Sequence, residues 1–199
     1  MGKLPSWFLD IKKENEVNTL PSWFLDIHQP SDPESKPITK MVRTVGPEEI
    51  NFTAASRGIR NNNPGNIEVG DPWEGRASAK ERLPHQEGED RFVVFKSPEF
   101  GIRAMTVLLQ TYRVKYGLTS ISGIINRWAP PEENDTEAYI KSVSEFTGID
   151  PDKRLDTSSA NVLNPLISAI IRQENKGQQP YSETTILTGI SLAFENEED

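Results

Sequence analysis

The stretch LNPLISAIIRQENKG, residues 163–177, is the most apolar helical run in the sequence. Its apolar residues recur at three- and four-residue intervals and define one face of a helix: Leu163, Leu166, Ile167, Ile170 and Ile171. Glu174 lies on the same face, one turn later. A carboxylate that ends an apolar face is partly desolvated, and desolvation disfavours its ionised form. Glu174 is therefore predicted to hold a proton near neutral pH, as the general acid of glycoside cleavage must.

The composition limits the chemistry and the partners of this chain. Its 199 residues contain 22 Lys and Arg against 30 Asp and Glu, so the net charge of -8 argues against nucleic acid as a partner. There is no cysteine and there are only two histidines, so we expect no disulfide, no metal site and no organic cofactor. No signal peptide or membrane span is visible, and we expect synthesis in the cytoplasm.

A verbatim repeat opens the chain, because LPSWFLDI occurs at residues 4–11 and again at 20–27. The residues around it are polar and rich in Pro, Ser, Glu and Lys, which predicts a disordered tail over residues 1–54. Each repeat offers a pair of aromatic anchors for a partner protein: Trp7 and Phe8 in the first, Trp23 and Phe24 in the second. The alternative is that both motifs fold back onto the domain that follows.

Residues 55–195 are predicted to form a mainly α domain with a small β element (α+β). Capping residues and apolar periodicity indicate helices that begin after Ser97, after Thr119 or Ser120, after Asn134 or Asp135, after Asn164-Pro165 and after Ser182. Two short apolar runs, residues 67–69 and 91–95, predict a β-hairpin around a polar excursion. Trp128 lies on an apolar helix face and is expected to pack in the core.

Four segments resemble enzymes that cleave bacterial cell walls. Residues 170–182, in which Glu174 is followed by a polar turn with Pro180 and Ser182, resemble the catalytic helix of lysozyme-like lytic transglycosylases. Residues 62–67 (NNPGNI), 92–102 and 129–139 resemble, in order, three segments of bacterial glucosaminidases. In that family the glutamate segment comes first, whereas here it comes last, and a circular permutation would explain the difference.

Residues 57–182 also resemble small bacteriophage virion proteins described as peptidoglycan lytic transglycosylases or as structural proteins. The resemblance implies a lysozyme-like domain that cleaves the MurNAc-GlcNAc β-1,4 bond with Glu174 as the acid. It implies a protein made in the host cytoplasm, carried in the virion and acting on the cell wall during genome entry. The repeats would then dock the enzyme to a capsid, portal or tail protein.

The remaining site residues follow from this resemblance. Five residues are expected to bind the glycan, the asparagines through acetamido groups and the tyrosines by stacking: Asn62, Asn63, Asn66, Tyr139 and Tyr181. The asparagines equally suit left-handed turn positions. Asp135 and Glu133 are candidates for the second carboxylate that a hydrolase needs, although both also suit a helix start. Two other functions stay open, a non-catalytic virion structural protein and a glycan-binding module.

Overall fold

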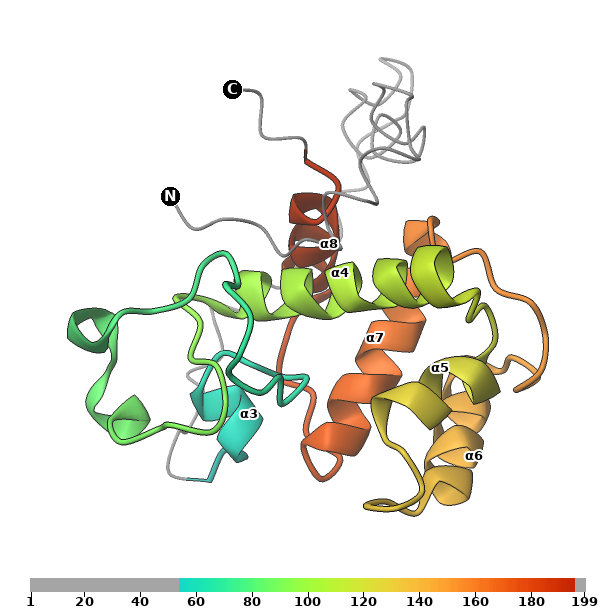
Figure 1. The fold of residues 1–199 in the computed structure, drawn as a ribbon, viewed down its shortest axis with the longest axis horizontal. Coiled ribbons are helices and arrows are strands. Elements are labelled where there is room, and N and C mark those ends of the chain that lie inside the picture. Colours follow the sequence, from blue (N-terminus) through green and yellow to red (C-terminus); the bar gives the residue numbers. More distant parts are fainter. Residues whose placement is uncertain (1–53, 196–199) are drawn as a thin grey trace, which may run out of the picture.

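The computed structural model describes residues 54–195 (Figure 1). The predicted tail with its anchors Trp7, Phe8, Trp23 and Phe24 lies outside the described residues, apart from Ala54. The described part is mainly helical, as predicted. In chain order the helices are α3 (Arg57–Arg60), η1 (Ala79–Glu81), η2 (Pro84–Gln86), α4 (Pro98–Tyr116), α5 (Ile121–Trp128), α6 (Thr136–Thr147), α7 (Ala160–Glu174) and α8 (Glu183–Leu192). None of these helices has the length and hydropathy needed to cross a membrane.

The helix ends follow the capping chemistry that the sequence predicts. Ser120, Asp135 and Ser182 each accept a hydrogen bond from the backbone N–H three residues later, and they start α5, α6 and α8. Gly117 and Gly148 end α4 and α6 in the left-handed conformation, which glycine adopts without strain.

The start of α7 was predicted too late. The helix begins at Ala160, and Pro165 lies inside its second turn. A proline has no N–H to donate, so the carbonyl of Asn161 loses its helical partner. Asn161 is exposed, so water can hydrate that carbonyl, and the buried side chains of Ala160 and Leu163 hold the first turn against the core.

The predicted β-hairpin is absent as a pair of strands from residues 54–195. Only two isolated antiparallel bridges form there, between Glu68 and Phe92 and between Arg76 and Phe95. Segment 91–96 divides its backbone hydrogen bonds among several partners: Ile67 and Val69, then Asn61, then Gly75 and Ala77. Because no single partner runs beside it for long, the extended segment is held in place without a continuous ladder.

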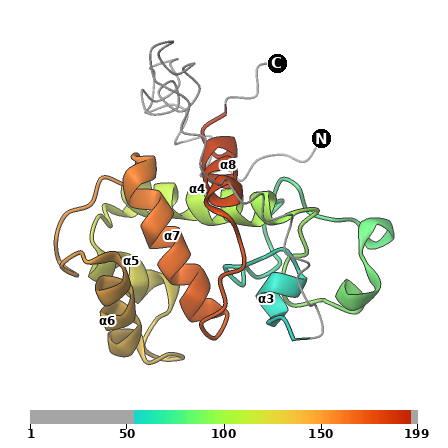
Figure 2. The same ribbon diagram turned by 180° about the vertical axis from the view of Figure 1, so that it is seen from behind.

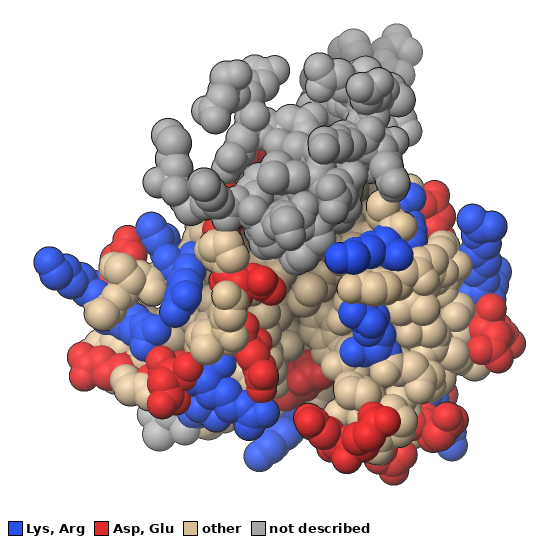
Figure 3. Space-filling view, viewed as in Figure 1, with Lys and Arg blue, Asp and Glu red and all other residues tan. Residues whose placement is uncertain are grey.

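The carboxyl end of α7 lies between two parts of the molecule. Figures 1 and 2 show α3 and the loop-rich segment 61–97 on one side of this end, and α5 with α6 on the other. The long helix α4 runs across both parts. The loop that joins α5 to α6 contains Glu132 and Glu133, Asp135 caps α6, and Glu137 lies in its first turn. Figure 3 shows acidic side chains gathered at the lower edge of the molecule.

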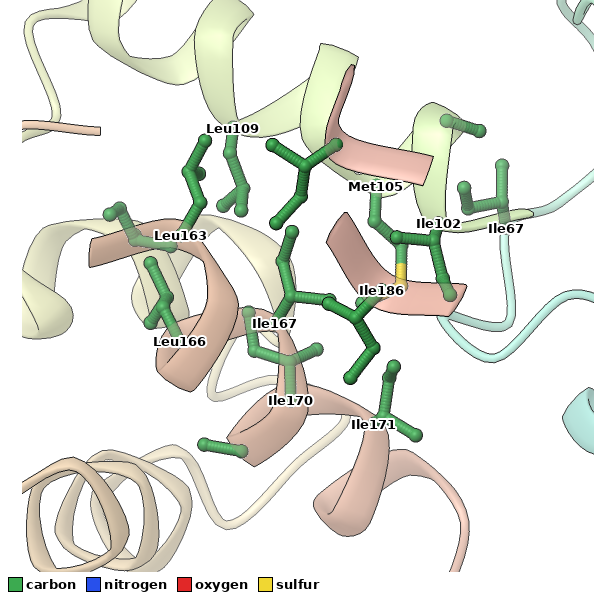
Figure 4. Close-up of a cluster of buried hydrophobic side chains, with 14 of the residues drawn as sticks. Ile67, Ile102, Met105, Leu109, Leu163, Leu166, Ile167, Ile170, Ile171 and Ile186 are labelled. Atoms are coloured by element: carbon green, nitrogen blue, oxygen red, sulfur yellow. The ribbon is translucent and has the colours of Figure 1, made fainter. Parts of the chain in front are cut away.

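The core forms where α4, α7 and α8 meet. Figure 4 shows the apolar face of α7 directed at Ile102, Met105 and Leu109 of α4 and at Ile186 of α8. The five apolar residues predicted for that face are all at most 1% exposed. Close approach of α8 to α4 requires Gly189, because a Cβ there would lie 2.6 Å from the side chain of Ile102. The same packing fixes the last turn of α7, which carries Glu174.

Candidate functional site

Glu174 is half-buried, as predicted, and three side chains donate hydrogen bonds to its carboxylate. Trp128 Nε1 and Tyr139 Oη each donate to Oε1 at 3.0 Å. Asn66 Nδ2 donates to Oε2, also at 3.0 Å. Trp128 and Tyr139 come from α5 and α6, whereas Asn66 comes from the opposite side of α7. The carboxylate is therefore held between the two parts of the molecule.

Asn66 is positioned by its backbone. Its φ of 49° is in the left-handed region, which asparagine tolerates better than most residues with a Cβ. Its amide nitrogen also lies 3.3 Å from the backbone carbonyl of Glu174. Gly58 of α3 makes room for this arrangement, since a Cβ there would lie 2.7 Å from Oδ1 of both Asn66 and Asn175.

Asn175 fixes the turn that follows the glutamate. It is fully buried, and its amide nitrogen donates to the carbonyls of Pro64 and Ile171, each at 2.8 Å. Its Oδ1 accepts a hydrogen bond from the hydroxyl of Ser56. The turn after α7 is therefore joined to the segment that precedes α3 and to the Asn-rich loop. This side chain was not among the predicted site residues.

Trp128 has a second role that the sequence did not reveal. It packs edge-to-face against Tyr112, with ring centroids 6.4 Å apart, which agrees with the expected core contact. Its ring nitrogen nevertheless reaches Glu174. Only the folded chain shows this, because the two residues are 46 positions apart.

Tyr139 is a permanent hydrogen-bond donor in this site. Burial raises the pKa of its hydroxyl well above the ordinary value of 10.0, and the neighbouring charge of Glu174 raises it further. The hydroxyl is therefore protonated at any physiological pH. The structure places Tyr139, which was predicted to stack on the glycan, beside Glu174 as a hydrogen-bond donor to the carboxylate.

An open pocket of about 380 Å³ lies on the Asn66 side of Glu174. Its lining combines the start of the described chain, α3, the Asn-rich loop and the turn after α7: Ala54, Ala55, Ser56, Arg57, Gly58, Arg60, Asn66, Glu174, Lys176 and Gln178. Glu174 is the only acidic residue among the described residues that line it. Among these residues a ligand would meet one carboxylate, two side-chain amides and three basic side chains.

Three predicted glycan-binding residues do not reach Glu174. Asn62 has a φ of 53° and donates to the carbonyl of Phe95. Asn63 has no exposed surface, and its amide bonds the backbone of Ile67 and Val93. Tyr181 is 8% exposed. Both asparagines thus shape the loop that presents Asn66, and in this conformation Asn63 has no atom free for a ligand.

The hydroxyl of Tyr181 is buried and has no hydrogen-bond partner among the described residues. Burial raises the pKa of this hydroxyl, and the negative charge of Glu99 adds to the effect. Its ring belongs to the hydrophobic core. It is therefore placed to pack rather than to stack on a sugar.

The two predicted second carboxylates are exposed and form no hydrogen bond with Glu174. Asp135 caps α6 by accepting from the N–H of Ala138 at 3.1 Å. Glu133 lies in the acidic loop before it. Glu68, next to the Asn-rich loop, pairs with Arg91 at 2.8 Å. Within residues 54–195 there is no group of three or more His, Cys, Asp or Glu able to hold a metal ion.

An ion pair between buried Glu89 and half-exposed Arg57 supports the α3 side of the site. Glu89 accepts hydrogen bonds from Nε and Nη2 of Arg57, from the amide of Asn61, and from the N–H groups of Arg91 and Phe92. Burial of Glu89 raises its pKa, but the hydrogen bonds from Arg57, Phe92, Asn61 and Arg91 outweigh burial and lower the pKa to about 2. Sequence reasoning missed this pair because its partners are 32 residues apart.

The comparisons with known proteins place this chain in a class of bacteriophage proteins. No protein-family model matches the chain. Protein P5 of Pseudoalteromonas phage PM2 is 45% identical over 153 residues, which cover 74% of this chain and 87% of that protein. The chain belongs to the same family as this Protein P5. The bacteriophage origin expected from the resemblance is thereby confirmed.

Proposed function

We propose that the chain is a virion-associated lytic transglycosylase with a lysozyme-like domain, which cleaves the MurNAc-GlcNAc β-1,4 bond of host peptidoglycan. The observation that carries this proposal is a single half-buried carboxylate, held by donors from two sides and open to a pocket. Three of the segments that carry the resemblance meet there: Asn66 comes from the first, Tyr139 from another and Glu174 from the helix end.

On this proposal, Oε2 of Glu174 is the carboxylate oxygen that carries the catalytic proton. Oε1 accepts from both Trp128 and Tyr139, which occupies its two lone pairs. Oε2 accepts from Asn66 alone. A proton on Oε2 therefore displaces no donor, and it lies on the same side as the pocket.

The reaction then needs one acid-base group. Glu174 donates its proton to the glycosidic oxygen as the bond from that oxygen to C1 of MurNAc breaks. The C6 hydroxyl oxygen of the same MurNAc attacks C1, and its proton returns to Glu174. The products are a 1,6-anhydro sugar and a free GlcNAc hydroxyl, and no water is consumed. Asp135 and Glu133 have no part in this route, whereas a hydrolase would need one of them to activate water.

The products of digestion test this proposal. Purified full-length protein is incubated with bacterial cell walls, and the soluble fragments are weighed by mass spectrometry. The anhydro route predicts fragments lighter by one water than those from hydrolysis. Fragments that carry the added water would show that the reaction is hydrolysis. Intact walls would favour a structural or glycan-binding protein.

Two substitutions by another aromatic residue test the donors to Oε1. Trp128→Phe and Tyr139→Phe each remove one hydrogen bond to a charged group, so we expect each to lower the rate of wall lysis about tenfold. Tyr181→Phe is the matched control, because the hydroxyl it removes has no partner among the described residues. If all three variants lyse walls at the same rate, the hydrogen bonds to Glu174 are irrelevant to turnover.

The amino-terminal repeats are proposed to dock the enzyme to a capsid, portal or tail protein. A chain that starts at Ala54 is expected to lyse walls normally in solution but to be missing from purified particles. Four alanines at Trp7, Phe8, Trp23 and Phe24 should have the same effect without shortening the chain. Normal packaging of both proteins would end the docking idea.

A further inference from the structure

The pocket beside Glu174 is basic in a chain whose net charge is -8. Three of its ten lining residues are cationic, Arg57, Arg60 and Lys176, and they come from α3 and from the turn after α7. None of the three forms an ion pair with Glu174 in the described part of the chain. They are therefore not simply the counter-ions of the glutamate.

Two of these positive charges have no acidic partner among residues 54–195. Arg57 uses its Nε and Nη2 edge for Glu89, which neutralises most of its charge. Within the part of the chain that the structure describes, Arg60 donates only to the backbone carbonyl of Ala55. Lys176 is exposed and makes no ion pair with residues 54–195. An open pocket in which positive charges gather in this way attracts an anion that is small enough to enter it.

The backbone conformation fixes the point from which the side chain of Lys176 extends. Its φ of 55° is in the left-handed region, which is uncommon for a residue with a Cβ. The residues on either side hold this turn, because Gly177 donates to the carbonyl of Arg172 at 2.7 Å and buried Asn175 bonds Pro64. The lysine is thus anchored in a rigid turn two residues after Glu174.

We infer that this pocket binds a carboxylate carried by a branch of the glycan, next to the bond that Glu174 cleaves. The inference rests on the proposed function and narrows its substrate to anionic glycans. Peptidoglycan has two sources of such a carboxylate, the lactyl group of a peptide-free MurNAc and the acidic residues of the stem peptide. Neutral amino-sugar polymers carry neither, so the basic pocket would select against them.

Binding of defined fragments tests the inference independently of cleavage. Full-length protein with Glu174→Gln is titrated calorimetrically with a GlcNAc-MurNAc-peptide fragment and with the same fragment after amidation of its carboxylates. In this background Arg60→Gln with Lys176→Gln is expected to lower the affinity for the anionic fragment about tenfold and to leave the affinity for the amidated fragment unchanged. Arg60→Lys with Lys176→Arg should restore binding, and high salt should shrink the difference.

A matched control removes the same two charges elsewhere. Lys153→Gln with Arg154→Gln changes exposed residues outside the pocket and should leave both affinities unchanged. Peptide-free GlcNAc-MurNAc, charged or amidated, separates the two sources of the carboxylate. If the protein still binds the charged form more tightly by the same factor, the site binds the lactyl carboxylate. If the two forms bind equally, the site binds a carboxylate of the stem peptide. Equal affinity of the Glu174→Gln protein for charged and amidated fragments, or an equal loss in the control, overturns the inference.

The two proposals fail separately. If the wild-type protein lyses walls but the titrations show no preference for charged fragments, the proposal of anion binding is refuted and the proposal of enzymatic activity stands. Charge-dependent binding without any wall lysis would refute the enzyme and keep the pocket as an anionic-glycan site.

Discussion

Replacing Glu174 by glutamine is expected to lower the rate of wall lysis about a thousandfold, because the amide has no proton to give to the glycosidic oxygen. The fold should survive the change. The amide oxygen can still accept from Trp128 and Tyr139, and Asn66 can rotate its amide to receive the new N–H group. A zymogram with wall-containing gel and a soluble turbidity assay measure the loss.

Asp135→Asn is the control for this experiment. Asparagine caps a helix as well as aspartate does, so this variant removes the exposed carboxylate and keeps the start of α6. We expect normal lysis from it. Normal lysis by the Glu174→Gln protein would remove Glu174 from the mechanism, and a large loss with Asp135→Asn would revive the hydrolytic route.

Replacing Glu89 by glutamine is expected to lower the free energy of unfolding by about 2–3 kcal/mol at pH 7. Glutamine has the same shape, but it cannot accept from Arg57, Asn61 and two N–H groups at once. Arg57 is half exposed and recovers some hydration, which limits the loss. Chemical denaturation measures the change. Glu145→Gln is the control, because Glu145 is exposed and pairs with Lys141 at a distance of 3.8 Å.

The pH dependence of this difference gives a second readout. The pKa of Glu89 is about 2 in the folded chain, below the ordinary value of 4.5. A carboxyl group with a lowered pKa stabilises the fold above its unfolded pKa, and this contribution disappears as the pH falls toward the folded pKa. The difference in the free energy of unfolding between wild type and Glu89→Gln should therefore be at its full size at pH 6 and should shrink between pH 4.5 and pH 2. A gap that stays constant over this range would show that the carboxylate charge is not the source.

Local chemistry made most of the helices predictable. Ser120, Asp135 and Ser182 start helices through hydrogen bonds to residues three positions away, and Gly117 ends one through its own backbone. Such signals lie within a few residues of each other and are visible in the sequence. Pro165 misled the prediction because its effect depends on whether water reaches the carbonyl of Asn161, which is a property of the folded surface.

The site was predictable only in part. The apolar face of α7 pointed to Glu174, and the asparagine and tyrosine candidates included Asn66 and Tyr139. The role of Trp128, the buried Glu89 and the full burial of Asn63 depend on contacts between segments that are far apart in sequence. The hairpin was predicted wrongly for the same reason, since the number of partners of segment 91–96 is set by the packing of α3 and the polar excursion.

The first described residues are tied directly to the turn after Glu174. The N–H of Ser56 donates to Oε1 of Gln178 at 2.9 Å, and Gln178 Nε2 donates back to the carbonyl of Ala54 at 3.1 Å. Together with the hydroxyl of Ser56 on Asn175, these bonds join the chain to the pocket at the point where it enters the domain. A mechanical load applied ahead of Ala54 would consequently arrive first at the turn after Glu174, before it reaches the core of α4, α7 and α8.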